Sequence, residues 1–161
     1  MKIEKGIFAC AGFWGVQHQM ERAKGVVGST VGYTGGKEQH PTYQEVKAHT
    51  TGHAEAVLVE YDAEQTTYKE LCKLFFEIHD PAQTDGQGPD IGPQYRSEIF
   101  YLNEAQKAEA EAIIQLLREK GYEVNTRLTP ASEFWPAEDY HQHYYDKTGG
   151  EPYCHIRVKK F

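Results

Sequence analysis

IFACAGFWG, residues 7–15, joins an apolar segment to a helical pattern through a turn of small residues. The run 7–9 is typical of a buried strand, and the apolar spacing that follows Trp14 predicts a helix that ends before Gly25. Cys10 lies at the turn between them. A thiol close to a helix N-terminus is stabilised as the nucleophilic thiolate, because the first helical amides are partly positive and lack partners within the helix. Cys10 is therefore either an activated nucleophile or a small, unreactive residue of the core.

The composition is that of a single acidic domain. The chain has 161 residues with 17 basic and 24 acidic side chains, and its formal net charge is -7. This balance, without a basic stripe, argues against a nucleic-acid or anionic-membrane partner. No apolar run is long enough for a secretion signal or a membrane span, so we expect one cytoplasmic domain over residues 1–161.

The three cysteines, Cys10, Cys72 and Cys154, indicate a reducing environment. An odd number argues against a set of structural disulfides and is compatible with one redox pair. Cys72 falls within a predicted amphipathic helix, where we expect it to fill space in the core. The histidines have no spacing typical of a metal site, and we expect no bound metal.

The order of predicted elements indicates an α+β fold. The elements are strand 4–9, helix 13–24, strand 26–33, strand 54–61, a helix after the cap at 66–67, strand 97–101, a helix capped by Asn103, and strand 123–128. The first six follow the order β-α-β-β-α-β, which is that of a ferredoxin-like two-layer sandwich. Segment 80–96 has no periodicity, which is typical of a functional or disordered loop. Beyond Pro130 we expect a long irregular tail.

Glu55 is the first candidate for acid–base chemistry. It begins a strand in which alternation places it on the same face as Val57 and Val59. A carboxyl group beside an apolar face has a raised pKa and can donate a proton near neutral pH. The alternative is that Glu55 is solvated at the end of the strand.

Nine short motifs occur along nearly the whole chain. They are FWG (13–15), VGYTGG (31–36), PTY (41–43), GHAE (52–55), YD (61–62), FFEIHDP (75–81), QGPDIG (87–92), QYRS (94–97) and AEDYHQ (137–142). In type and order they resemble the peptide methionine sulfoxide reductases of the A type, which are specific for the S epimer. The resemblance implies a thiol enzyme that reduces methionine sulfoxide to methionine.

The resemblance also implies a role for individual side chains. In chain order, Phe13 and Trp14 match the aromatics around the substrate methyl group, Glu55 matches the acid that protonates the sulfoxide oxygen, Tyr43, Tyr95 and Tyr144 match hydroxyls that bind this oxygen or orient the acid, and Asp90 matches the carboxylate that holds the polar part of the substrate. The physical logic is consistent, because protonation makes the sulfoxide sulfur electrophilic and an aromatic cage directs it toward a thiolate.

The chain departs from the family at the nucleophile. The residue before Phe-Trp is the catalytic cysteine in the family, whereas this chain has Gly12 there and a cysteine two places upstream. In an extended turn Cys10 would point to the same side as position 12, about 6–7 Å back along the chain. Cys154 falls close to where many members carry the resolving cysteine, which turns a sulfenic acid into a disulfide for thioredoxin. We therefore expect thioredoxin or a dithiol as external reductant, no bound cofactor, and a monomer.

Three hypotheses of function follow. In the first, Cys10 is a relocated nucleophile that works with Glu55 and Cys154 on methionine sulfoxide, free or in proteins. In the second, the chain is a pseudoenzyme or binding module that still holds a methionine sulfoxide-like group without reducing it. In the third, the same pocket serves a different thiol reaction. A second thiol near the C-terminus favours chemistry over binding, because a pocket that only binds does not need one.

Overall fold

The computed structural model describes residues 2–10, 12–48, 51–83, 86–87, 90–149 and 158–161. Its elements are, in chain order, β1 (Ile3–Ala9), α1 (Phe13–Glu21), β2 (Val26–Thr34), α2 (Tyr43–Lys47), β3 (Ala54–Asp62), α3 (Tyr68–Glu77), β4 (Gly86–Gln87), β5 (Asp90–Ile91), the 3-10 helix η1 (Pro93–Tyr95), β6 (Glu98–Tyr101), α4 (Glu104–Glu119), β7 (Arg127–Pro130), β8 (Trp135–Pro136), the 3-10 helix η2 (Asp139–His141) and α5 (Tyr144–Thr148). None of the helices in these ranges has both the length and the hydropathy needed to cross a bilayer.

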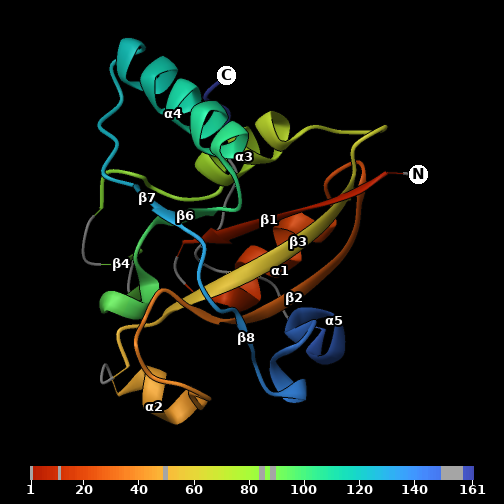
Figure 1. Ribbon diagram of the computed structural model, residues 1–161, viewed down its shortest axis with the longest axis vertical. Coiled ribbons are helices and arrows are strands. Elements are labelled where there is room, and N and C mark those ends of the chain that lie inside the picture. Colours follow the sequence, from red (N-terminus) through yellow and green to blue (C-terminus); the bar gives the residue numbers. More distant parts are fainter. Residues whose placement is uncertain (1, 11, 49–50, 84–85, 88–89, 150–157) are drawn as a thin grey trace.

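The larger sheet has the strand order β7-β6-β1-β3-β2-β8. β1 pairs antiparallel with β3 and β6, and β3 pairs antiparallel with β2. The four central strands therefore confirm the predicted ferredoxin-like order, in which β1 and β2 are joined by a helix and separated in the sheet by β3. β7 extends the sheet parallel to β6, and β8 extends it antiparallel to β2 (Figure 1).

Apolar side chains on the two faces of the sheet form separate clusters. On one face, Phe8 of β1 packs on Tyr68 and Phe75 of α3, and residues of α1 and α4 join the same cluster. Ile7 and Ala9 point to the other face, where the segment between β7 and β8 covers a smaller cluster. This alternation is the expected consequence of strand geometry. Figure 1 shows α3 beside α4, and α1 lies against β2 and β3.

Local sequence determines where α3 and α4 begin. Thr67 Oγ1 accepts a hydrogen bond of 3.1 Å from the backbone N–H of Glu70. Asn103 Oδ1 accepts one of 2.9 Å from the backbone N–H of Gln106. Each cap satisfies an amide that has no partner within its helix. Both predicted helix starts are therefore confirmed.

The first helix is shorter than predicted. It ends at Glu21 rather than near residue 24. The backbone N–H of Val26 donates to the carbonyl of Ala23 in a turn, and Gly25 adopts a φ of 86°, in the left-handed region that glycine tolerates best. The turn brings the chain directly from α1 into β2.

The last predicted strand is displaced toward the C-terminus. Pairing with β6 begins at Arg127 rather than at residue 123, and the N–H of Arg127 donates to the carbonyl of Ser97. The N–H of Asn125 instead donates to Pro81, in the loop after α3. The prediction was wrong here because the hydrophobic pattern does not show that this loop competes for the strand's hydrogen bonds.

Segments predicted to be irregular contain short elements. Helix α2 lies in segment 37–52, where no element was predicted, and begins with a capping box, in which Thr42 and Glu45 each accept a hydrogen bond from the other's backbone N–H. The loop 80–96 contains the β4–β5 hairpin and η1. The described part of the tail contains β8, η2 and α5, so it is more ordered than predicted.

Candidate functional site

A glutamate side chain from β3, that of Glu55, reaches the N-terminus of α1. Glu55 is buried on the same face as Val57 and Val59, as predicted. Its Oε1 accepts a hydrogen bond of 3.2 Å from the backbone N–H of Phe13, the first residue of α1. Helix α1 has no side-chain cap at Gly12, so Glu55 satisfies an amide at the positive end of the helix. The alternative of a solvated Glu55 is thereby excluded.

Aromatic rings surround this end of α1. Phe13 packs on Tyr43 of α2 and on His141 of η2, with ring centroids 6.4 and 5.2 Å apart. Trp14 stacks on Tyr144 of α5 with centroids 3.7 Å apart and an interplanar angle of 8°. We call these five rings the aromatic cluster. It unites four residues that the family resemblance singled out, and it adds His141.

His141 occupies the centre of the aromatic cluster as a neutral imidazole. Its ring is fully buried, and its Nδ1 accepts a hydrogen bond of 2.9 Å from Trp14 Nε1. Burial lowers the pKa of His141, although the nearby Glu138 carboxylate opposes this shift. An accepting Nδ1 leaves the proton on Nε2, which has no hydrogen-bond partner among the described residues. This N–H can therefore donate to an oxygen atom that enters the cluster.

Glu138 connects the aromatic cluster to the sheet. It accepts hydrogen bonds from the Tyr33 hydroxyl at 2.9 Å and from the Tyr43 N–H at 3.1 Å. Burial by itself would raise the pKa of Glu138, but its hydrogen bonds hold that pKa below the ordinary value. Burial, together with the Glu138 hydrogen bond, raises the pKa of Tyr33. The pair is therefore an ionised carboxylate and a neutral phenol that fix α2 against β2.

Burial also determines the state of Cys10. Its side chain is fully buried, and this burial raises the pKa of the thiol well above its ordinary value. The Lys160 ammonium group partly opposes the rise. That ammonium donates hydrogen bonds to the carbonyls of Phe76 and His79, at the C-terminal end of α3. Of the two alternatives for Cys10, the buried position matches the residue of the core, and the raised pKa disfavours a thiolate in this position.

The sequence profile of the family described as peptide methionine sulfoxide reductase matches residues 4–161. The chain belongs to this family.

Several relatives of this reductase family are similar over most of their length. MsrA of Acinetobacter baumannii (strain AYE) is 44% identical over 156 residues, which cover 97% of this chain and 90% of that protein. MsrA of Methanosarcina acetivorans is 49% identical over 150 residues, which cover 91% of this chain and 80% of that protein. The crystal structure of reduced Mxr1 from Saccharomyces cerevisiae has a TM-score of 0.89 at 34% identity, over 97% of this chain and 92% of that one. Mxr1 has also been solved in complex with Trx2, with a TM-score of 0.64 at 25% identity, over 99% of this chain and 91% of that one.

The structure describes three further residues that the reductase resemblance singled out. Gly12 is the N-cap residue of α1, with extended φ and ψ angles of -67° and 132°. Tyr95 ends η1, which packs against β3. Asp90 belongs to β5, whose backbone pairs it with Gln87. Cys154 lies outside the described residues, so its place near the site stays a prediction.

Cys72 behaves as predicted. Its side chain is fully buried within α3, in the same core cluster as Phe75. Burial raises the pKa of its thiol, and a hydrogen bond with Tyr68 opposes the shift. Cys72 therefore has a packing role. Its thiol can serve as a reference against which the reactivity of Cys10 is compared.

Reasoning from the sequence missed Tyr33, Glu138 and His141, although all three lie in motifs shared with the reductase family. The bond between Tyr33 and Glu138 joins residues 105 apart, which no local pattern can show. A weaker signal was present, since Glu138 and His141 are three positions apart, as residues on one side of a helical turn are. The 3-10 helix η2 supplies that turn.

One group of described side chains, Glu21, His143 and Asp146, has the spacing of a metal site, with ligand atoms within 4.8 Å of one another. These atoms already have protein partners. Glu21 pairs with His143 at 2.5 Å and accepts a hydrogen bond from Ser29. Asp146 pairs with Arg22 at 3.3 Å. Their proximity is explained by these pairs, and the reductase chemistry needs no metal there.

Proposed function

We propose that the protein reduces methionine S-sulfoxide, free or within proteins, to methionine. The observation that carries the proposal is the Glu55 carboxyl group, held 3.2 Å from the Phe13 amide beside the aromatic cluster. An apolar aromatic cage fits the substrate methyl group, and a proton donor beside it activates the sulfoxide oxygen. Membership of the family and the similarity to reductase structures support the same reaction.

Cys10 is the proposed nucleophile and Glu55 the proposed acid. The Cys10 thiolate attacks the sulfoxide sulfur while Glu55 transfers its proton to the oxygen. The attack forms a sulfur–sulfur bond. That bond and the sulfur–oxygen bond of the substrate then both break as the hydroxyl group bonds to the Cys10 sulfur, so methionine leaves and Cys10 becomes a sulfenic acid. Since the thiol is fully buried, attack requires Cys10 to leave its buried position.

The remaining residues have supporting roles in this proposal. Tyr43, Tyr95 and Tyr144 bind the sulfoxide oxygen or orient the acid, and Asp90 binds the polar part of the substrate. Phe13 and Trp14 hold the methyl group, and the absence of a side chain at Gly12 leaves room for Cys10 to approach. The aromatic stacking around Phe13 and Trp14 supports this arrangement.

Regeneration uses a second thiol and an external reductant. Cys154 attacks the sulfenic acid, water leaves and a disulfide forms, which thioredoxin reduces with two electrons. The complex of a related protein, Mxr1, with Trx2 supports this choice of partner. The protein acts in this proposal as a cytoplasmic monomer without a bound cofactor.

The test is turnover of the S epimer of methionine sulfoxide with dithiothreitol, and separately with thioredoxin. We expect the intact chain to be active, Cys10→Ser to be inactive, and Glu55→Gln to lose activity by about 10²–10⁴-fold, as removal of a general acid does. Cys154→Ser should lose multiple turnovers with thioredoxin while keeping the first one.

Two matched variants serve as controls. Cys72→Ser removes a buried thiol of the core, and Glu60→Gln neutralises another carboxylate of β3. Both should retain the activity of the intact chain if they remain folded. Full activity in Cys10→Ser would overturn the assignment of the nucleophile, and a lack of turnover by the intact chain with either reductant would overturn the reaction itself.

A further inference from the structure

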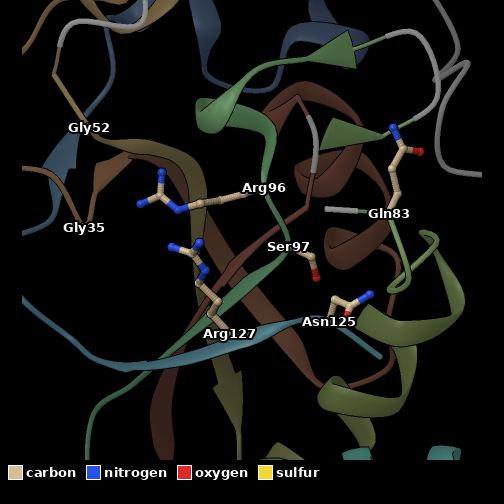
Figure 2. Close-up of a pocket in the computed structure, with 7 residues that line it drawn as sticks. All are labelled: Gly35, Gly52, Gln83, Arg96, Ser97, Asn125 and Arg127. Atoms are coloured by element: carbon tan, nitrogen blue, oxygen red, sulfur yellow. The ribbon is translucent and has the colours of Figure 1, made fainter. Parts of the chain in front are cut away.

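Figure 2 shows a cavity of about 360 Å³ near the start of β6, with Arg96 and Arg127 in its wall. Arg96 forms an ion pair of 2.6 Å with Glu98. In the β1–β6 register Glu98 pairs with Ala9, which belongs to the smaller apolar cluster, on the face of the sheet opposite Glu55. The sheet therefore separates the charged side of this cavity from the aromatic cluster. The polar groups that hold the aromatic cluster in place lie along α1 instead.

A closed circuit of polar contacts joins α1 to β2 and to the residue before α5. Gln17 Nε2 donates a hydrogen bond of 3.1 Å to Ser29 Oγ, which in turn donates one of 2.7 Å to Glu21 Oε1. His143 Nδ1 lies 2.5 Å from the same Glu21 oxygen. The backbone N–H of His143 completes the circuit by donating a hydrogen bond of 2.6 Å to Gln17 Oε1. We call these four residues the Gln17 circuit.

Gln17 is the buried member that connects α5 to the rest of the circuit. Its side chain is 1% exposed, so its amide depends on Ser29 and His143 for hydrogen bonds. The ion pair between Arg22 and Asp146 also joins α1 to α5, but both side chains are about half exposed, and such pairs contribute little. The bond from His143 to Gln17 is therefore the main polar attachment at the start of α5.

This attachment lies where the backbone has an unusual conformation. His143 has φ and ψ angles of 55° and 43°, in the left-handed region that residues other than glycine seldom adopt. Such a conformation persists where the surrounding contacts determine it. Helix α5 has five residues, which is too short for a helix to be stable by itself. The direction in which Tyr144 leaves the turn therefore depends on how His143 is held.

Tyr144 is the residue that this turn delivers to the aromatic cluster. Its ring lies parallel to that of Trp14, with centroids 3.7 Å apart. Trp14 and Gln17 are three positions apart in α1, so they lie on the same side of the helix. One side of α1 thus supplies both the indole ring and the amide that fixes the ring stacked on it.

We propose that Gln17 is a positioning residue of the substrate site. By binding the His143 amide it fixes the turn that stacks Tyr144 on Trp14, and the stacked rings form one wall of the cage for the substrate methyl group. The inference rests on the proposed reductase function. It gives Gln17 a role that acts entirely through Tyr144.

The test is a double-mutant cycle with Gln17→Met and Tyr144→Ala. Methionine has nearly the shape of glutamine without its hydrogen bonds. We expect Gln17→Met to lower kcat/KM for methionine S-sulfoxide by about two- to tenfold, the effect of losing one aromatic contact, and to act mainly through KM. In the Tyr144→Ala background the same change should have no further effect, because residues that act as a unit are not additive.

Gln115→Met is the matched control, since it removes an exposed amide of α4 and should leave kcat/KM unchanged. If Gln17→Met does not fold, Ser29→Ala takes its place in the cycle. Ser29→Ala removes a partner of the Gln17 amide, and it should lower kcat/KM less than Gln17→Met, again only when Tyr144 is present. Additive losses in the cycle, or equal kcat/KM values for Gln17→Met and Gln115→Met, would overturn the proposal.

The position of Tyr144 can also be measured without substrate. Proton NMR signals of the Tyr144 ring, assigned by comparison with Tyr144→Phe, should be shifted upfield by the indole ring current. Gln17→Met should move them toward the values of an unstacked tyrosine, whereas Gln115→Met should not. A chain that shows this change but does not reduce methionine sulfoxide would contradict the proposed function and leave the role of Gln17 standing. An active chain whose Tyr144 signals ignore Gln17→Met would contradict only the role of Gln17.

Discussion

The Cys10 side chain experiences two opposing influences. Burial favours the neutral thiol, and the Lys160 ammonium group favours the thiolate. Burial is the stronger of the two, since the net effect raises the pKa of Cys10. The reactive form of this residue is therefore scarce near neutral pH.

The reactivity of Cys10 should rise steeply with pH. Below a raised pKa the thiolate fraction increases about tenfold per pH unit. Alkylation by iodoacetamide in a chain with Cys72→Ala and Cys154→Ser should therefore accelerate about tenfold per unit between pH 7 and pH 9. Lys160→Met removes the opposing charge and should slow the reaction at every pH in this range.

The neighbouring exposed Lys159 provides the control, because Lys159→Met changes the net charge equally. It should leave the rate of alkylation unchanged. A rate that reaches a plateau below pH 8 would show that the thiolate is already formed, contrary to the expected pKa shift.

A cysteine at position 12 should be more reactive than Cys10. The extended φ of -67° and ψ of 132° at Gly12 suit any residue, so Gly12→Cys introduces no backbone strain. The new thiol would stand at the N-cap of α1, where the helix favours the thiolate. We expect the double variant Cys10→Ser, Gly12→Cys to reduce methionine sulfoxide faster than the intact chain, as measured by methionine formation at pH 7.

The variant Cys10→Ser, Gly12→Ala keeps a small side chain at position 12 without a thiol, and it should be inactive. Equal rates for the two double variants would mean that the thiol at position 12 does not reach the substrate.

At the scale of elements, some helix N-termini are fixed by local caps and one is fixed by a long-range contact. Helices α3 and α4 begin at Thr67 and Asn103, whose side chains bond to the third residue that follows. Helix α1 has no such cap and depends on Glu55, 42 positions further along the chain, as the bond to Phe13 shows. The N-terminus of α1 is thus fixed by a contact with a distant strand, whereas the N-termini of α3 and α4 are fixed by residues next to them in the sequence.

Removing the cap of α4 should destabilise the protein by about 1 kcal/mol. Asn103→Ala leaves the N–H of Gln106 without its side-chain acceptor. Urea unfolding followed by circular dichroism measures the loss. Glu111→Ala, at an exposed position inside α4, should change stability by no more than about 0.5 kcal/mol. Equal effects of the two changes would show that the cap contributes nothing.

The sequence predicted long, periodic elements and missed short ones. Strand β3 and helices α3 and α4 have enough residues for alternation or a helical stripe to appear. Helices α2 and α5 have five residues each and β8 has two, which is too few for a period to be visible. The Thr42–Glu45 capping box at the start of α2 is visible in the sequence, but the prediction did not use it.

The sequence identified several residues of the site but not the contacts between them. Motif residues such as Phe13, Glu55 and Tyr43 were identified by family resemblance, and the structure places them at one helix end. The partners that fix them, Glu138 and His141, come from a segment without periodicity. The sequence left open whether Cys10 is an activated thiol or a residue of the core, because its burial, which raises the pKa of the thiol, is a property of the whole fold.

At the scale of the molecule, β1 is the strand that contributes side chains to the core on both faces of the sheet. It lies at the centre of the sheet between β6 and β3, and its alternating side chains enter both apolar clusters. The turn that follows it leads into α1 and therefore into the site. A change in the packing of β1 is for this reason expected to alter the geometry of the site.

Shortening Phe8 should destabilise the molecule strongly. The ring is fully buried against Tyr68 and Phe75, so Phe8→Ala leaves a cavity and should cost about 3–5 kcal/mol. That is a large part of the stability of a typical domain, about 5–15 kcal/mol. Thermal and urea unfolding measure the change. Val27→Ala, at a position 52% exposed, should stay within about 0.5 kcal/mol of the intact chain, and a similar loss there would contradict the role of the core.

The stack of Trp14 on Tyr144 has a practical consequence. The chain has two tryptophans, and the other, Trp135, lies on β8 against His40. Trp135→Phe would leave a single indole, inside the aromatic cluster, whose emission depends on what touches its ring. Such a variant carries its own optical probe of the site, through which arrival of a substrate, departure of a product and closing of a disulfide can be followed in real time without any label.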